Sequence, residues 1–434
     1  MKIIRKTTST CPECLRKISA DIIEDKDNVY MIKECLKHGM FKVLLAKDIS
    51  SYNQLSNAYF SVNSSNGRFI SSSKQEDFIL MLTYRCNLNC SICYTDSNNI
   101  KYKDPSIDEI KKAISGLKKS RIFLFGGEPT VREDLPQIIK TIIKSQNFPA
   151  LFTNGIKLQD LSYCKKLKEC GLKEVRLSFD SFDDKDYNKI RGISLLKEKL
   201  KTLHNLERLK IPTTLEVTVL RGINDKSINS LLDYAVNHNF IKGIFFRHYT
   251  YLGRKGFNYE KSYTLFELVD LVANQTKNKI SKKDIISFQK LIYIYYKLIN
   301  KRKCFHDLIY FLYRKDKNYI TLKHLFNLNK LDSKIDCLLK SKKLKKSDFY
   351  LSLMTSLNIK SLFLLKEILH LFLKSSFSKE FNASEIQSNL LFIGFQTLCN
   401  AYTIDLELTK NCTSGILLPG KIENRCEGHV LHNF

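Results

Sequence analysis

The stretch Cys86-Asn-Leu-Asn-Cys90-Ser-Ile-Cys93 stands just after the apolar run Phe78–Leu82. Three thiolates on one loop can hold three irons of a cubic [4Fe-4S] cluster, which leaves the fourth iron without a protein ligand. Clusters that only carry electrons usually have four cysteine ligands, whereas an open metal position can bind a substrate or cofactor. The spacing therefore predicts a reactive iron–sulfur centre. The alternative is a structural zinc site whose fourth ligand comes from elsewhere in the chain.

Residues 77–254 alternate short apolar runs with segments of helical periodicity, such as Ile107–Leu117 and Ile228–Ala235. Six such units predict a parallel sheet with right-handed crossovers, and they are too few to close an eight-stranded barrel. We therefore expect an α/β fold, a partial (β/α)6 TIM-like barrel, with its site at the C-terminal ends of the strands. The expected strands are Ile79–Thr83, Arg121–Phe125, Ala150–Thr153, Glu174–Phe179, Thr214–Leu220 and Gly243–Arg247.

The rest of the 434-residue chain divides by composition. Residues 1–50 are expected to form a rubredoxin-like or zinc-knuckle-like module, and residues 51–76, rich in Ser and Asn, a linker. Residues 255–390 are basic and aromatic and show helical periodicity. Residues 391–434 return to cysteine-bearing loops, so the sequence predicts a helical plus loop-rich C-terminal region.

The net charge is +27, and residues 301–350 supply a third of it with 14 Lys and Arg against 5 Asp. An anionic surface is one interpretation and solvated lysines are the other. No RNA-reading or DNA-reading motif accompanies the charge, so nucleic acid is not an expected partner. The helical spacing of Leu362, Leu365, Leu369 and Phe372 predicts either a core helix or a helix that contacts a membrane surface or lipid tail.

The cysteines indicate a reducing compartment. The N-terminus has no apolar signal-peptide core, and no apolar run approaches about 18 residues, so we expect a cytoplasmic protein whose membrane contact would be peripheral. There the 13 cysteines favour metal sites over disulfides. Four of them match no motif and are expected to be core or surface thiols: Cys164, Cys170, Cys304 and Cys337.

Three further motifs follow the next predicted strands. Phe125-Gly-Gly-Glu-Pro129 has paired glycines, which let a ligand approach the backbone, and Glu128 offers acceptors for an ammonium group. Thr153-Asn-Gly155 is a turn with a polar side chain, and Ser178-Phe-Asp180 ends the fourth strand. Each motif alone is a weak signal, but their order on successive strand ends indicates one site.

This combination resembles the radical S-adenosylmethionine superfamily over roughly residues 77–250. In that superfamily three cysteines hold the cluster, and the amino and carboxylate groups of S-adenosylmethionine chelate the open iron. One electron, from a donor such as flavodoxin or ferredoxin, cleaves the cofactor to methionine and a 5′-deoxyadenosyl radical. That radical abstracts a hydrogen atom from an unactivated C–H bond.

The resemblance implies that Cys86, Cys90 and Cys93 are the iron ligands. It assigns the cofactor amino group to the Gly-Gly-Glu-Pro tetrad, the carboxylate and ribose to the strand-end polar groups, and adenine to an aromatic side chain and a strand edge. The implied cofactor-binding residues are Tyr94, Gly126, Gly127, Glu128, Pro129, Asn154, Ser178, Arg191 and Leu220. Position 92, often aromatic in the family, is Ile92 here, and the aromatic residue is shifted to Tyr94.

The N-terminal module carries its own metal motif. Cys11-Pro-Glu-Cys14 and Cys35-Leu-Lys-His38 form two short knuckles about twenty residues apart. Three thiolates and one imidazole predict a mononuclear site for Zn²⁺ or Fe. Because no coordination position stays open, we expect this site to be structural or electron-carrying.

The C-terminal cysteines Cys399, Cys412 and Cys426 have spacings of 13 and 14, which is not a standard zinc pattern. They predict an auxiliary [4Fe-4S] cluster, and buried free cysteines are the alternative. Leader and tail together resemble the archaeal tetraether lipid synthases and the related pterin-methylating radical enzymes. The tail departs from their pattern, because Arg425 replaces a proline and Glu427-Gly-His429 replaces an aromatic-Asn pair.

The resemblance implies hydrogen abstraction followed by C–C bond formation or methyl transfer, on a lipid-like or small-molecule substrate. Radical modification of a peptide or natural product is the alternative within enzymes. The non-enzymatic alternative is a zinc-binding scaffold that uses its +27 charge to bind nucleic acid.

Overall fold

The computed structural model describes residues 1–65, 68–69, 77–299, 303–341, 344–358, 389–418 and 421–424. The predicted lipid-contacting helix at residues 362–372 and Cys426 lie outside them. Within the described part of the chain, no helix is long and apolar enough to cross a membrane.

The N-terminal module is a four-stranded antiparallel sheet whose strands follow chain order. Burial alternates along its third strand, where Val29 and Met31 face the core, as the two-residue period of a strand requires. One cysteine knuckle lies between the first two strands and the other at the turn between the last two. The strands are β1 (Lys2–Thr10), β2 (Lys17–Asp25), β3 (Asn28–Cys35) and β4 (Gly39–Ala46).

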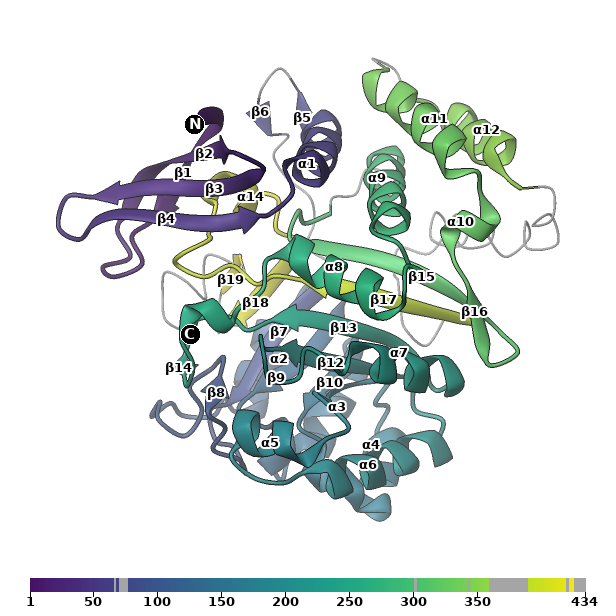
Figure 1. The fold of residues 1–434 in the computed structure, drawn as a ribbon. Helices are drawn as coiled ribbons and strands as arrows, with labels where there is room; N and C mark the ends of the chain where they lie inside the picture. The colour runs from purple at the N-terminus through teal and green to yellow at the C-terminus, as the bar shows by residue number, and fades with distance from the viewer. Residues whose placement is uncertain are drawn as a thin grey trace.

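Six neighbouring parallel strands form the centre of the molecule and confirm the predicted partial barrel. Each connecting helix buries one apolar side. Helix α3 (Leu135–Lys144), for example, turns Ile138, Ile139 and Ile142 toward the core. The strands are β7 (Asp77–Thr83), β9 (Arg121–Gly126), β10 (Phe148–Thr153), β11 (Glu174–Ser178), β12 (Thr213–Val219) and β13 (Ile241–His248). The helices are α2 (Ile107–Ala113), α3 (Leu135–Lys144), α4 (Leu161–Glu169), α5 (Asp184–Arg191), α6 (Leu196–Arg208) and α7 (Ile228–Asn237), several of which lie along one side of the strands in Figure 1.

The C-terminal part of the chain contains the predicted helices and loops, and it also extends this sheet at both edges, which the sequence did not predict. The run Leu390–Phe395 is apolar and pairs in parallel with β13, and residues 414–417 pair in parallel with β7 at the opposite edge. Both segments satisfy backbone groups that would otherwise stay unpaired at the sheet edges. The added strands are β15 (Asp307–Lys315), β16 (Asn318–Ile320), β17 (Leu390–Gln396), β18 (Ser414–Leu418) and β19 (Lys421–Asn424) (Figure 1).

Two expectations about the connecting regions need correction. Much of the predicted linker is a helix, α1 (Ile49–Asn63), because Tyr52, Leu55 and Tyr59 recur at helical spacing among the Ser and Asn residues. Tyr59 packs against Tyr293 with ring centroids 5.4 Å apart. The basic region is helical as predicted but also contributes β15 and β16 to the sheet. Its helices are α8 (Leu265–Gln275), α9 (Lys282–Leu298), α10 (Leu322–Leu325), α11 (Leu328–Lys340) and α12 (Lys346–Ser356).

Candidate functional site

A cavity of about 230 Å³ opens at the C-terminal ends of the barrel strands. It gathers most of the predicted site: Cys86, Cys90, Cys93, Tyr94, Gly126, Gly127, Glu128, Asn154, Ser178 and Arg191. Two predicted residues do not line it. Pro129 begins a buried single-turn helix, η1 (Pro129–Val131), and Leu220 packs against Ile92 and Tyr249.

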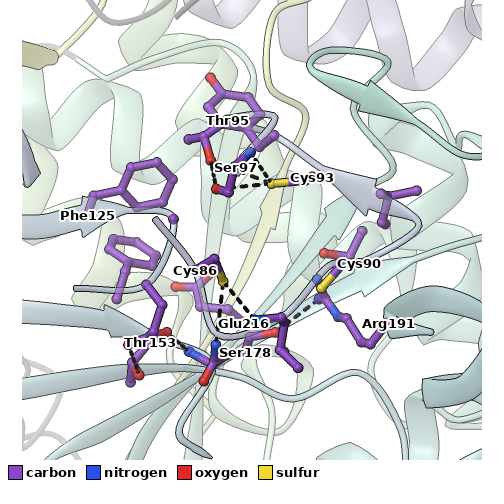
Figure 2. Close-up of a pocket in the computed structure, with 18 of the residues that line it drawn as sticks. Cys86, Cys90, Cys93, Thr95, Ser97, Phe125, Thr153, Ser178, Arg191 and Glu216 are labelled. Atoms are coloured by element: carbon purple, nitrogen blue, oxygen red, sulfur yellow. Dashed lines mark hydrogen bonds between the residues drawn. The ribbon is translucent and has the colours of Figure 1, made fainter. Parts of the chain in front are cut away.

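The three thiols of the triplet surround the same space (Figure 2). Burial raises the pKa of the Cys86 thiol to about 12. At Cys93 burial acts the same way but is outweighed by hydrogen bonds with the Ser97 and Thr95 hydroxyls and from the Ser97 backbone nitrogen, so the pKa is lowered. Arg191 hydrogen-bonds to Cys90. Thiolate is the ligand form of cysteine, and an all-thiolate donor set suits iron–sulfur chemistry. These residues therefore fit an iron–sulfur cluster.

The two glycines allow a close contact within the chain itself. A Cβ at Gly126, whose φ is +147°, would lie 2.2 Å from the Thr83 carbonyl oxygen, and one at Gly127 would lie 2.3 Å from that of Arg85. The backbone nitrogen of Gly127 donates to Thr83 over 2.8 Å, and that of Glu128 donates to Arg85 over 3.0 Å. The glycines thus let this segment pack directly on the chain that leads into the cysteine triplet.

The carboxylate of Glu128 is buried and accepts four hydrogen bonds from its own chain. Its Oε1 accepts from the backbone nitrogen and hydroxyl of Thr130 and from the Thr153 hydroxyl, and its Oε2 accepts from the Asn154 backbone nitrogen over 2.6 Å. Burial raises the pKa of Glu128, and the hydrogen bonds act against this shift. The side chain therefore ties two strand ends together.

A cationic pair lies on the other side of the cavity. Arg191 Nε donates to Asp180 over 2.9 Å, and its terminal nitrogen donates to the Ser178 hydroxyl over 3.0 Å. Lys199 Nζ donates to the backbone oxygens of Asn154 and Ser178 over 2.6 and 2.5 Å. Burial, aided by the charge of Arg191, lowers the pKa of Lys199 to about 8. Lys199 was not predicted from the sequence. A lysine among the buried apolar positions of a helix is unusual, and that position could have marked it as a site residue.

The N-terminal module brings its four predicted ligands together. The ligand atoms of Cys11, Cys14, Cys35 and His38 all lie within 4.8 Å of one another. His38 Nδ1 is 3.5 Å from the sulfurs of Cys11 and Cys35. Hydrogen bonds from the Lys37 backbone and then from His38 lower the pKa of Cys35 to about 6. This donor set fits a tetrahedral mononuclear metal ion.

Comparison with known families agrees with both sites. Residues 80–235 match the family described as the radical SAM superfamily, and residues 3–47 match the HMPTM N-terminal zinc ribbon domain. The match over residues 80–235 implies a [4Fe-4S] cluster and S-adenosylmethionine as the cofactors of that segment.

Two curated proteins are similar to this chain. The 7,8-dihydro-6-hydroxymethylpterin dimethyltransferase of Methanocaldococcus jannaschii is 33% identical over 328 residues, which are 69% of this chain and 65% of that protein. A probable GTP 3′,8-cyclase of Pyrococcus abyssi is 36% identical over 165 residues, 37% of this chain and 53% of that protein. The chain thus spans less than two thirds of either relative. The solved structure of histidine-tagged anSMEcpe with bound AdoMet overlaps 70% of this chain and 83% of its own, at 19% identity and a TM-score of 0.40.

The radical SAM cavity also has a charged floor, which the sequence reading missed. Arg176 donates to Glu216 over 2.7 Å, and Arg247 donates to both Glu216 and Gln396. The Arg176 guanidinium lies 5.6 Å from the ring centre of Phe152. These charged residues lie on the cavity side of strands whose other residues are mostly apolar. The two-residue alternation of a strand could have predicted that their side chains point into the barrel.

Two of the three C-terminal cysteines, Cys399 and Cys412, lie in the described part of the chain. Cys399 is buried beside Ile404, and the Cys412 thiol lies 3.5 Å from the Ser414 carbonyl oxygen. Burial raises the pKa of Cys304 to about 12, and the neighbouring Cys412 adds to this shift. Of the other unassigned thiols, two are buried and one is exposed: Cys164, Cys170 and Cys337 respectively.

Replacing Cys14 with Ser should remove one metal ion per chain from the N-terminal module. A tetrahedral site loses most of its affinity for the metal when one of its four ligands is removed. Metal analysis of the purified protein measures this loss. The visible absorbance of the reconstituted cluster should stay unchanged, and Cys337→Ser, at an exposed position, serves as the control. Full metal content in Cys14→Ser would contradict the assignment.

Proposed function

We propose that this protein cleaves S-adenosylmethionine reductively at a [4Fe-4S] cluster held by Cys86, Cys90 and Cys93. When bound, the cluster and cofactor supply a 5′-deoxyadenosyl radical for hydrogen abstraction from an unactivated carbon. The observation that carries this proposal is that one cavity, at the strand ends, collects the three thiols together with the Gly126–Glu128 segment and Arg191. A small one-electron carrier such as flavodoxin or ferredoxin is the proposed donor.

The chain's own groups would orient the cofactor. Backbone acceptors of the Gly126–Pro129 segment are the proposed partners of its amino group, since the Glu128 carboxylate is already hydrogen-bonded. Ser178 and Arg191 are proposed for the carboxylate and ribose, and Asn154 stands beside them. The aromatic side chains that line the cavity help to exclude water, which protects a reactive radical.

Adenine is proposed to lie near Tyr94, whose ring packs at 6.3 Å against Phe125. Leu220 does not line the cavity, but it packs against Ile92 and Tyr249, which do. Its effect on adenine would therefore be indirect. Stacking on aromatic and apolar side chains is a general mode of base recognition. The Tyr94 position thus compensates for the aliphatic residue at position 92.

We propose a small planar heterocycle as the substrate, modified by methyl transfer or C–C bond formation. The charged floor supports this choice, because Glu216, Arg176, Arg247 and Gln396 offer hydrogen-bonding edges beside the ring of Phe152. A polar ring can add hydrogen bonds to these already paired groups, whereas a lipid chain would displace water from them without offering any. The printed name of the pterin dimethyltransferase relative points the same way. A peptide or other natural product is the second candidate.

Replacing Cys90 with Ala should abolish 5′-deoxyadenosine formation, because two thiolates do not hold a site-differentiated cluster in place. The assay is anaerobic reconstitution with iron and sulfide, followed by incubation with S-adenosylmethionine and a chemical reductant. Cys337→Ala, far from any predicted ligand set, should retain full activity. If the wild-type protein binds only zinc and forms no 5′-deoxyadenosine, the proposed function fails.

Lys199 should make cofactor affinity depend on pH. With a pKa of about 8, its ammonium is charged below that pH and attracts the cofactor carboxylate, and it loses its charge as the pH rises through about 8. Lys199→Met keeps the aliphatic stem and removes the charge. Equilibrium dialysis with cluster-loaded protein should show the variant about tenfold weaker at neutral pH, with the difference vanishing above about pH 9.

The cofactor's own amino group titrates identically in both proteins, so the ratio of the two dissociation constants isolates the lysine. A ratio that is constant across this range would show that the charge of Lys199 does not contact the cofactor.

We also propose that Cys399, Cys412 and Cys426 hold an auxiliary [4Fe-4S] cluster, with Cys304, whose pKa the neighbouring Cys412 raises, as the fourth thiol. Cys412→Ala should then retain uncoupled cleavage of S-adenosylmethionine but block product formation and lower the iron content. Product formation at the wild-type rate in this variant would remove the auxiliary cluster from the mechanism. Cys164→Ala, a buried core thiol, is the matched control for loss of a cysteine.

A further inference from the structure

A second cavity, of about 260 Å³, lies between the N-terminal sheet, α8 and the C-terminal segment. Leu44 of β4, Tyr52 of α1 and Phe266 of α8 line it, as does Phe305 just before β15. It shares one side chain, His248, with the radical SAM cavity. No motif of the sequence and no step of the proposed reaction uses this second cavity.

Aromatic rings form part of its wall. The ring of Tyr52 packs against those of Phe266 and Phe305 at centroid distances of 6.1 and 6.0 Å. Tyr259 and Tyr263 add two more rings to the lining. Flat apolar walls of this kind favour a planar ligand through area burial and ring contacts.

The charged groups around the second cavity are already satisfied. Arg5 is paired with Asp405. Glu267 accepts from Lys47 over 2.8 Å and from Arg221 over 3.1 Å, and the remaining carboxylate of the lining, on residue 260, is exposed to solvent. A charged ligand would lose its hydration here without gaining a free counter-charge from the described lining residues.

His306 also lines this cavity, and one of its ring nitrogens has no hydrogen-bond partner among the described residues. His306 Nδ1 lies 3.4 Å from the Thr397 hydroxyl, whereas its Nε2 is buried and has no hydrogen-bond partner among the described residues. Buried polar atoms normally have partners, and a single unpartnered one beside an apolar cavity indicates a missing ligand group.

We infer that the second cavity binds a small uncharged aromatic molecule that hydrogen-bonds to Nε2 of His306. The ligand would be separated from the reaction cavity by the His248 imidazole. That imidazole is held on both sides, by the Leu398 carbonyl at 3.1 Å and the Ser262 hydroxyl at 3.1 Å. The site is therefore next to the reaction centre but distinct from it, and its existence does not depend on the proposed reaction.

The test uses two fluorescent probes with the same ring skeleton and the full-length, metal-loaded protein. N-phenylnaphthylamine is neutral and has one N–H, whereas anilinonaphthalene sulfonate adds a negative charge. We expect saturable binding of the neutral probe and at least about tenfold weaker binding of the sulfonate. Equal affinity for the two probes, or no saturable binding, would overturn the inference.

Two variants locate the binding site. Leu44→Trp fills the cavity from a half-buried strand position and should abolish binding of the neutral probe. His306→Phe keeps the ring but removes the hydrogen bond and should weaken binding about fivefold to tenfold. Leu351→Trp, at a position 63% exposed on α12, is the control and should bind as the wild type does.

Unchanged binding in either cavity variant would place the probe elsewhere and refute the site. If Leu44→Trp fails to retain its N-terminal metal ion, His306→Phe alone decides the outcome, since it alters no strand of the N-terminal sheet.

Discussion

The arrangement of the cavity at the strand ends depends on the four hydrogen bonds that the buried Glu128 carboxylate accepts. A carboxylate out of water is costly unless its oxygens are hydrogen-bonded, and here two neighbouring strand ends supply the donors. The same segment hydrogen-bonds through its backbone to the chain that enters the cysteine triplet. On the far side, Lys199 bonds to the ends of β10 and β11. A continuous set of hydrogen bonds therefore fixes four successive strand ends relative to one another.

The N-terminal module is fastened to the same frame by a buried cation. Lys33 is 2% exposed, and its ammonium donates to Ser9 and to the backbone oxygens of Ala401 and Tyr402. Tyr402 in turn stacks on Tyr259 at 4.8 Å. The module packs on the segment that follows β17 and forms one wall of the second cavity.

Local patterns predicted the local features of this chain. The six central strands, the cysteine triplet and the four N-terminal ligands each depend on residues close in sequence, and all were found. Features that depend on distant partners were missed. The apolar run Leu390–Phe395 does not reveal that it pairs with β13. The ion pair of Arg176 with Glu216 likewise depends on the pairing of β11 with β12, which neither strand's own sequence reveals.

The edges of the central sheet have a consequence for how the chain is made. Residues 77–80 and 414–417 are direct neighbours in the sheet, and β13 is covered by a strand that begins at Leu390. During synthesis the N-terminal parts emerge first, so β7 and β13 present unpaired apolar edges until residues 390–417 have been translated. Such edges invite pairing with other chains. A ribosome-bound chain is therefore exposed to aggregation at these two edges until β17 and β18 emerge, and these strands protect the sheet as well as extend it.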